Sequence, residues 1–583
     1  MDPALPATDR SPLTARALGV GCLIGALLTV ANVYMALKTG IWDGGFPTGV
    51  ILAFGLVGTL SFRGRRPYSV QENLVSQAVA AAACAMPATA GLLGALPGLA
   101  LMGRDYPAWV ITGWGLGLAL VGLSIGLILW RRLVREEALP FPTGRATADA
   151  IAAMHAAGAA GLGRARALAA SSAIAGLVTW LRDMPPGWIP AIAPLPLSIA
   201  GHSAASLGLG LGASPLMLGV GALIGAQVGL SMMLGALLAW AVLGPAALRS
   251  GAVHEAGFTT LVGWLTWPGV GLMVGGAMTS LLMQGGVFLR SLRDLGAAGR
   301  GSARSVDPET PPAFLARAGS VAVAGAALAV VVAWLGFGMH PLITVLALAL
   351  SVLLASVAAR SAGQTDFTPL GTLGQLGQVL FGPLTLGQPA VNIAAASVAA
   401  GDAAQSTTLV YMQRAGDPLG VRLRTTWACS LVGIVVGSLA CVPSYLLITH
   451  AYGLGSEALP ASSARTWKAV TEVVAQGGAA LPADAVRAAW IGLALGVVLS
   501  LLSRGRLRAW LPSAVAMGMG FIIPAYYSIT ICLGALLFAL ARRRRPDATD
   551  HLGPAIASGA IAGESLMGVA IAILISTGVL KGH

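Results

Sequence analysis

Five acidic residues fall in apolar parts of the sequence, where an ionised side chain is expensive: Glu72, Asp149, Asp366, Asp402 and Glu564. A charge near the middle of a bilayer costs about 2.5 kcal/mol or more, and such residues usually face a wet cavity. Carboxyl groups in such a place can bind a proton or a cationic group of a solute. The structural alternative is that each carboxylate caps a helix end or pairs with a nearby arginine.

Two polar stretches that contain acidic residues are also interrupted by glycine and proline. They are residues 68–91 (YSVQENLVSQAVAAAACAMPATAG) and residues 361–383 (SAGQTDFTPLGTLGQLGQVLFGP). Interrupted membrane helices free backbone groups that a solute or ion can satisfy, and paired interruptions in two halves of a chain mark binding sites. We therefore expect a substrate-binding or proton-coupling site at Gln71, Glu72, Asn73, Gln364, Thr365 and Asp366, with Asp149, Asp402 and Glu564 as further candidates.

Two basic residues in apolar surroundings are weaker candidates. Lys38 is expected to extend its charge toward the membrane surface, as long basic side chains do. His155 has the chemistry of a proton carrier, because the unperturbed pKa of histidine is near 6.5. A polar position at a helix end is the more common role for such a histidine.

The helices that position these side chains must lie in lipid. The chain has 583 residues, of which 56% are hydrophobic and 10% are charged, and its mean hydropathy is +0.80. A soluble domain carries about 25% charged residues. The 78 glycines fall within apolar runs, which is typical of closely packed membrane helices. Because a spanning helix needs about 20 apolar residues, we predict an all-α polytopic membrane protein with about 16 membrane segments, some of them re-entrant.

The formal net charge of +13 does not indicate a nucleic-acid-binding protein. The arginines stand in short clusters between apolar segments, as the positive-inside rule describes, and no basic soluble domain with aromatic platforms occurs. The five cysteines are scattered singly, so the sequence indicates neither a zinc site nor a disulfide framework. We expect no cofactor and no resident metal.

An internal repeat is predicted from three matches that keep the same order along the chain. Residues 146–166 and 404–424 share the pattern M-x3-G-x5-R-x-R without a gap. The other two matches are residues 203–215 with 513–524, and Pro47 and Gln71 with Pro341 and Gln364.

The predicted organisation therefore has two duplicated halves. Residues 1–15 form a short cytosolic tail, 16–289 the first membrane repeat, 290–312 a basic hydrophilic linker, and 313–583 the second membrane repeat. Both repeats begin on the cytosolic side, which favours parallel repeats.

The chain resembles the oligopeptide transporter family, which includes the yellow stripe-like metal-chelate carriers, and in particular its prokaryotic members. The resembling stretches are NVYMALKTG (32–40), SVQENLVSQ (69–77), ALPFPTGRATADAI (138–151), SAGQTDFTPLG (361–371), SAVAMGMGF (513–521) and AGESLMG (562–568). The resemblance implies about 16 membrane segments that arose by duplication. It also implies proton-driven import of small peptides, peptide-like compounds or metal chelates. Family members often have a glutamate where this chain has Gln364.

Other classes of membrane protein fit less well. The apolar segments contain no HExxH or GxSxG motif of a membrane-embedded enzyme, and no Walker A loop of a primary pump. A channel usually assembles symmetrically around one short filter, whereas this chain has two long halves. The expected partners are a solute (a small peptide or a metal chelate), protons and the lipid bilayer, with the chain placed as a multi-pass protein of the cytoplasmic (inner) membrane. A homodimer is compatible with the sequence, and sodium coupling is the alternative to proton coupling.

Overall fold

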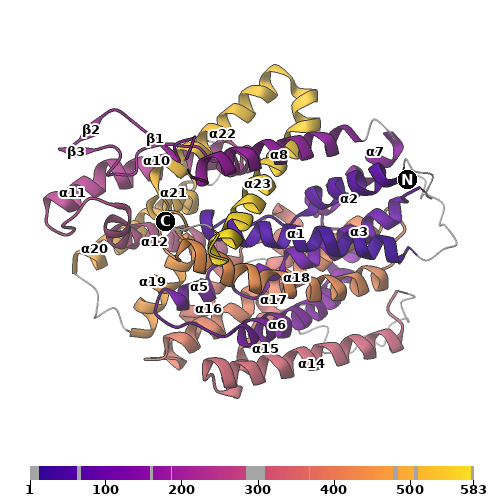
Figure 1. The fold of residues 1–583 in the computed structure, drawn as a ribbon. Coiled ribbons are helices and arrows are strands. Elements are labelled where there is room, and N and C mark those ends of the chain that lie inside the picture. Colours follow the sequence, from indigo (N-terminus) through magenta and orange to yellow (C-terminus); the bar gives the residue numbers. More distant parts are fainter. Residues whose placement is uncertain are drawn as a thin grey trace.

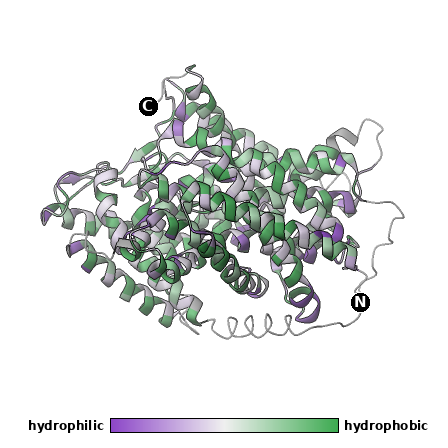
Figure 2. Ribbon diagram, turned by 90° about the horizontal axis from the view of Figure 1, so that it is seen from below, coloured by the Kyte–Doolittle hydropathy of each residue, from purple (hydrophilic) through white to green (hydrophobic). Residues whose placement is uncertain are grey.

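The computed structural model describes residues 12–61, 67–157, 162–185, 187–283, 309–366, 368–476, 483–503 and 510–579. Within these ranges, ten helices are long and apolar enough to cross a bilayer. In Figure 2 the long helices are mostly hydrophobic, and the hydrophilic residues gather mainly toward their two ends. The predicted all-α polytopic class is therefore confirmed, and the number of 16 segments stays a prediction.

The first half contains helices and two small hairpins, in which β1 pairs with β4 and β2 with β3, both antiparallel. In chain order the elements are α1 (Ala15–Thr39), α2 (Phe46–Ser61), α3 (Val70–Cys84), α4 (Met86–Thr89), α5 (Ala95–Ala100), α6 (Ala108–Trp130), the π-helical η1 (Arg131–Glu136), α7 (Pro142–Ala157), α8 (Leu162–Asp183), β1 (Ile192–Pro194), β2 (Ser198–Ile199), β3 (His202–Ser203), β4 (Gly210–Gly212), α9 (Pro215–Ile224), α10 (Ala226–Ala236), the π-helical η3 (Leu237–Leu243), α11 (Gly244–Arg249) and α12 (Phe258–Met283).

The second half is helical, and its elements pack among those of the first. Helix α17 lies against α6, and α18 lies against α1 and α3, as the mixing of indigo and orange ribbons in Figure 1 shows. In chain order the elements are α14 (Pro312–Phe337), α15 (Pro341–Thr365), α16 (Leu370–Phe381), the 3-10 turn η4 (Gly382–Leu384), α17 (Pro389–Gly416), α18 (Leu423–Tyr452), α19 (Ser462–Gln476), α20 (Ala483–Leu502), α21 (Ala514–Ile522), α22 (Ala525–Arg544) and α23 (Pro546–Ser576).

Glycines bring several helix pairs into backbone contact. A Cβ atom on Gly563 of α23 would overlap the carbonyl oxygen of Ser172 in α8, and one on Gly275 of α12 would overlap the carbonyl oxygen of Leu493 in α20. In lipid, where the hydrophobic effect does not hold helices together, close backbone approach provides the packing that does. These positions explain why glycines stand inside the apolar runs.

Two of the matched pairs of segments can be compared in secondary structure. Residues 146–166 and 404–424 each contain the end of one helix and the start of the next, in α7–α8 and α17–α18. Residues 203–214, by contrast, are strand, turn and coil, and Pro215 begins helix α9, whereas 514–522 form helix α21. These two segments differ in backbone conformation, because shared glycine spacing in a glycine-rich chain does not fix it, and the duplication stays a prediction. The boundaries of the two halves stay a prediction, and most of the linker (290–308) lies outside the described residues.

Candidate functional site

A cavity of about 620 Å³ lies where interrupted helices of both halves meet. Its wall includes the connection after α1, the turn between α4 and α5, and the connection between α15 and α16. Left-handed backbone ends two of these segments: Gly40 (φ 76°) caps α1 and Asp366 (φ 62°) caps α15. Gly91 (φ 76°) turns the chain between α4 and α5. A helix often ends at such a residue, so these breaks follow from local backbone chemistry.

One face of α17 forms a further wall of the cavity. The lining residues of this helix recur at helical spacing and are small or hydroxyl-bearing: Ser397, Ala400, Ala404, Thr407, Thr408 and Tyr411. Among the described lining residues, Asp43 and Asp366 are acidic and none is Lys, Arg or His. The cavity therefore suits a solute that presents a cationic group together with hydrogen-bonding groups.

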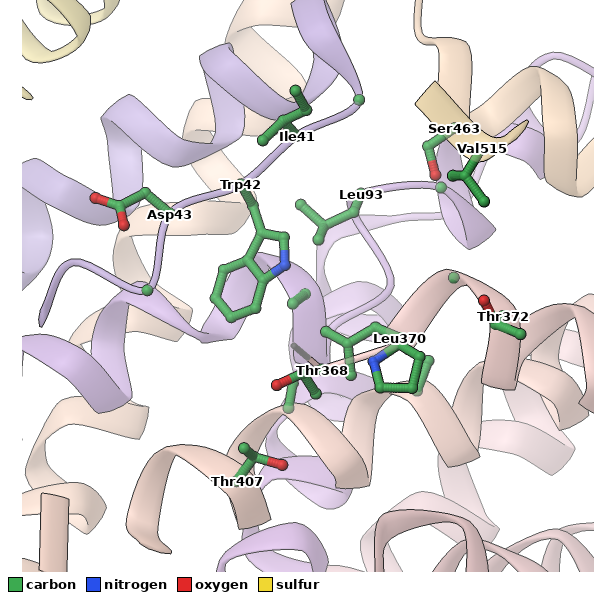
Figure 3. Close-up of a pocket in the computed structure, with 18 of the residues that line it drawn as sticks. Ile41, Trp42, Asp43, Leu93, Thr368, Leu370, Thr372, Thr407, Ser463 and Val515 are labelled. Carbon is green, nitrogen blue, oxygen red and sulfur yellow. The ribbon is translucent and has the colours of Figure 1, made fainter. Parts of the chain in front are cut away.

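Trp42 and Asp43 lie in the connection after α1, and the sequence analysis did not select them. The amide of Asn32 holds this connection in place by donating to the Asp43 carbonyl oxygen (2.6 Å) and accepting from the Asp43 N–H (3.0 Å). Figure 3 shows the Trp42 ring projecting toward Leu370 and Thr368. Burial raises the pKa of the Asp43 carboxyl above its usual value, although hydrogen bonds with Gly45 and Thr48 oppose this. The signal in the sequence was the polar, glycine-rich run GIWDGG between two spans.

Asp366 lies at the cavity and also binds the start of α7. Its carboxylate accepts from the Thr143 N–H (3.0 Å), from the Thr143 hydroxyl (2.6 Å) and from the Tyr411 hydroxyl (2.9 Å). A carboxylate near a helix N-terminus satisfies an unpaired N–H and is favoured by the helix dipole. Gln364 is exposed in the last turn of α15, which ends at Thr365. Asp366 thus combines a structural contact with a place on the cavity wall.

The polar group around Glu72 does not reach the cavity. Glu72 completes a capping box with Ser69 at the start of α3 and forms an ion pair with Arg16 (2.6 Å). Its neighbour Asn73 contacts His155 of α7 (3.4 Å). His155 lies twelve residues along α7 from Thr143, the partner of Asp366, or about 18 Å at 1.5 Å per residue.

Of the polar stretch 68–91, the C-terminal end therefore lines the cavity, and the carboxylate of Glu72 does not. Ala88 and Gly91 are part of the wall, whereas Glu72 is held by a helix cap and an arginine. Gln71 donates to the carbonyl oxygen of Leu419 (3.5 Å). Asp149 is exposed on α7. The structure brings none of Gln71, Glu72, Asn73 and Asp149 into the cavity wall.

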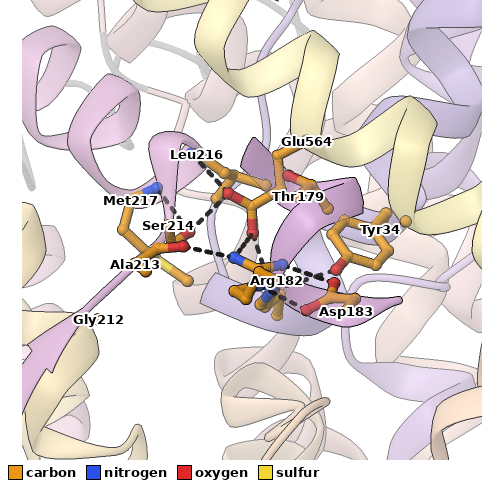
Figure 4. Close-up of polar contacts among 12 residues, drawn as sticks. Tyr34, Thr179, Arg182, Asp183, Gly212, Ala213, Ser214, Leu216, Met217 and Glu564 are labelled. Atoms are coloured by element: carbon orange, nitrogen blue, oxygen red, sulfur yellow. Dashed lines mark hydrogen bonds and ion pairs between the residues drawn. The ribbon is translucent and has the colours of Figure 1, made fainter. Parts of the chain in front are cut away.

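Glu564 lies in a buried ionic network, shown in Figure 4. The carboxylate is fully buried and pairs with Lys38 (3.0 Å) and Arg182 (3.2 Å). It also accepts from the hydroxyl of Ser214 (2.8 Å) and from the N–H of Leu216 (2.9 Å) at the start of α9. The expectation that Lys38 extends to the membrane surface is wrong: it is 5% exposed, because the pairing with Glu564 offsets the cost of burying its charge.

Asp402 is fully buried in α17, on the face turned away from the cavity. Its carboxyl contacts the hydroxyl of Ser351 in α15. Unlike Glu72 and Glu564, it forms no ion pair with the described residues.

Comparison with known proteins finds relatives that match nearly the whole chain. A relative in Saccharomyces cerevisiae is 22% identical, and the match covers 96% of this chain and 95% of the relative. One in Haemophilus influenzae is 23% identical, with 94% and 93% covered, and both are described as a "putative oligopeptide transporter". An Arabidopsis thaliana relative, described as a metal-nicotianamine transporter, is 23% identical with 97% and 92% covered. The family model of the OPT oligopeptide transporter protein matches residues 12–575, and the chain therefore belongs to the oligopeptide transporter family of membrane transporters.

Proposed function

We propose that this transporter is a proton-coupled symporter that carries small peptides or peptide-like compounds into the cytosol, across the cytoplasmic (inner) membrane. The observation that carries the proposal is the cavity of about 620 Å³, whose size lies within the usual range of about 300–1,000 Å³ for small-molecule sites. Interrupted segments from both parts of the chain form its wall, as is expected of a transporter that is built from internal repeats.

The charge of the cavity favours a solute with an amino group. Asp43 and Asp366 supply negative charge, and no described lining residue supplies positive charge. The α-amino group of a peptide is cationic at neutral pH and can pair with such a carboxylate. The hydroxyl groups of Thr407, Thr408 and Ser463, which also line the cavity, are suited to peptide N–H and C=O groups.

A metal chelate is the second candidate solute. Among the described residues, no group of three or more His, Cys, Asp or Glu side chains could hold a metal ion. A metal that entered this cavity would therefore keep the ligands of its own chelator, and the protein would recognise the outside of the complex. The description of the Arabidopsis relative as a metal-nicotianamine transporter supports this alternative.

Uptake into proteoliposomes tests the function. With an acidic exterior and a neutral interior, we expect labelled dipeptides to accumulate, with a protonophore abolishing accumulation and sodium having no effect. A nickel–nicotianamine complex is assayed in parallel, and its accumulation in place of dipeptides would favour the second candidate. If neither solute accumulates under the proton gradient, or if accumulation requires sodium, the proposal is wrong.

A matched pair of tryptophan variants tests whether the cavity is the solute site. Trp42→Ala removes a ring from the cavity wall, and we expect the half-saturating concentration to rise by about two- to tenfold, since aromatic contacts contribute about 0.5–1.5 kcal/mol. Trp510→Ala removes a ring that is 88% exposed and should leave uptake unchanged. Equal effects of both substitutions would refute the assignment of the site.

A further inference from the structure

Helix α17 has two functionally different faces. Ser397, Ala400, Ala404 and Thr407 line the cavity, and at 3.6 residues per turn their mean direction is about 180° away from that of Asp402. Asp402 therefore lies on the opposite side of the same helix. A change in the position of α17 must alter the surroundings of both the solute and this carboxyl group.

The contacts of Asp402 are those of a neutral acid. Its Oδ2 atom contacts the hydroxyl of Ser351, which also lies 2.8 Å from the carbonyl oxygen of Leu348. A serine hydroxyl has one proton, and a carbonyl oxygen can only accept. When Ser351 donates to Leu348, the proton between Ser351 and Asp402 has to come from Asp402.

The opposite arrangement, with an ionised Asp402, leaves the charge almost unsupported. The carboxylate would then have one hydrogen bond, from Ser351, while its Oδ1 atom is buried without a partner. A buried carboxylate is stable when it is paired and hydrogen-bonded, and otherwise takes up a proton. Glu564, with its two cations and two further donors, shows what a stable buried carboxylate in this protein has.

Among the described residues, the helices seen next to Asp402 are α4, α6 and α15, and none of them brings a charged group to it. Helix α6 contacts it through Gly122, whose Cβ position lies 2.6 Å from the Asp402 carbonyl oxygen, and the sequence of α6 contains no titratable residue. The short helix α4 contains none either. In α15 the one ionisable residue is Arg360, which is paired with Glu137 (2.6 Å) and lies nine residues, or about 14 Å, from Ser351.

We propose that Asp402 is the residue that binds the transported proton, and that α17 couples this proton to the solute on its opposite face. The inference rests on the proposed symport function and deepens it, because it assigns the proton and the solute to different faces of one helix. In the state described here the acid holds its proton. When α17 moves and Asp402 meets water on the cytosolic side, the O–H bond breaks, the proton passes to water, and the carboxylate keeps the electron pair. Reprotonation from the outer side resets the helix.

The geometry of α17 permits such movement. Gly122 and Gly126 of α6 face the backbone of Asp402 and Ser406, so at these two positions no side chain of α6 projects into α17. The proton on Asp402 and the solute in the cavity then both influence the position of α17. A shared element of this kind is the physical requirement for coupling between two sites.

Two transport assays on Asp402→Asn test the inference. The amide keeps a donor toward Ser351 and nearly the same shape, but it cannot release a proton. For one proton per solute, a gradient of one pH unit supports at most about tenfold accumulation, and the variant should show none. Without a gradient, the rate at which labelled solute exchanges for unlabelled solute should stay within about threefold of the wild-type rate. This is less than the tenfold change that corresponds to 1.4 kcal/mol. The exchange rate of the variant should also no longer depend on pH. Asp484→Asn changes an exposed acid and serves as the matched control.

The outcomes separate this inference from the proposed function. If the wild-type protein shows no proton-driven accumulation, the proposed function fails and the inference fails with it. If the wild type accumulates solute and Asp402→Asn does so equally well, only the inference is overturned. Loss of both accumulation and exchange in a folded variant would also overturn it, because Asp402 would then be needed for every transport step.

A second variant decides the case in which Asp402→Asn does not fold. Ser351→Ala leaves the acid in place but removes its hydrogen-bond partner, and alanine is well accepted in a helix. We expect the pH at half-maximal accumulation to shift while exchange persists. An unchanged pH profile would overturn the inference.

Discussion

Removing the carboxylate of Glu564 should destabilise the folded protein strongly. The buried network contains two cations, Lys38 and Arg182, and two anions, Glu564 and Asp183. In Glu564→Gln both cations remain with one anion, and the new amide nitrogen faces either the two cations or the donors of Ser214 and Leu216. Breaking a buried pair by removing one partner costs about 3–5 kcal/mol.

The same network predicts a rescue. Lys38→Met alone leaves Arg182 with two anions and should also be destabilising. The double variant Lys38→Met/Glu564→Gln retains Arg182 paired with Asp183, so one cation again faces one anion. We expect its cost to fall short of the sum of the single costs by about 2 kcal/mol, within the range found for residues in one ionic network.

Thermal unfolding of the purified protein measures these effects. An unfolding entropy of about 2.1 cal/mol/K per residue over 583 residues gives about 1.2 kcal/mol/K, so about 3–5 kcal/mol corresponds to about 2.5–4 °C in Tm. The control is Glu136→Gln, which breaks an exposed pair with Arg131 (3.4 Å) and should shift Tm by less than about 1 °C. If Glu564→Gln and this control have the same Tm, the buried carboxylate is not ionised and the reasoning about the network is wrong.

Two further predictions concern packing and pH. Gly563→Ala places a Cβ atom against the carbonyl oxygen of Ser172 and should destabilise the protein by about 1–3 kcal/mol. Gly19→Ala, where nothing lies within 4 Å of the new atom, should not, and equal Tm values for both would contradict the packing argument. Burial lowers the pKa of His155, so its stabilising contribution is present above the unfolded value of about 6.5 and is lost as pH falls through the folded pKa. The Tm of the wild type should therefore fall more between pH 7 and pH 5 than that of His155→Gln, and parallel curves would show that His155 is not responsible.

The class of fold was predictable because lipid imposes strong constraints on composition. A chain with 10% charged residues has no polar surface to present to water, and helices are the simplest way to satisfy its backbone in a bilayer. The end of a helix near Asp366 was predictable as well, because the glycine- and proline-rich residues 361–383 interrupt the helical pattern there. The arrangement of helices was not predictable, because α17 and α18 pack among α1, α3 and α6 through contacts that depend on the whole fold.

The candidate site was harder to predict, because a carboxyl group in an apolar stretch has several physical roles. Glu72 and Glu564 have the same side chain, yet one completes a helix cap and the other joins a buried network with Lys38. Their ion-pair partners lie 56 and 526 residues away, so no local pattern reveals the ion pairs. The local S-x-x-E spacing of Ser69 and Glu72 indicates only the capping box. Asp43 was missed because it lies between two spans and not inside one.

The candidates for proton coupling differ in whether their carboxyl groups have ion-pair and hydrogen-bond partners. A carboxylate with cations and several donors holds its charge throughout a transport cycle, because protonation would discard those interactions. Glu72 and Glu564 are of this kind, which suits them to fix α1, α3, α8, α9 and α23 relative to one another. A coupling residue needs the opposite property, namely two protonation states close enough in free energy for a movement of the protein to exchange them. Asp402, buried with one hydroxyl partner, meets that requirement because exposure to water alone would change which state is favoured.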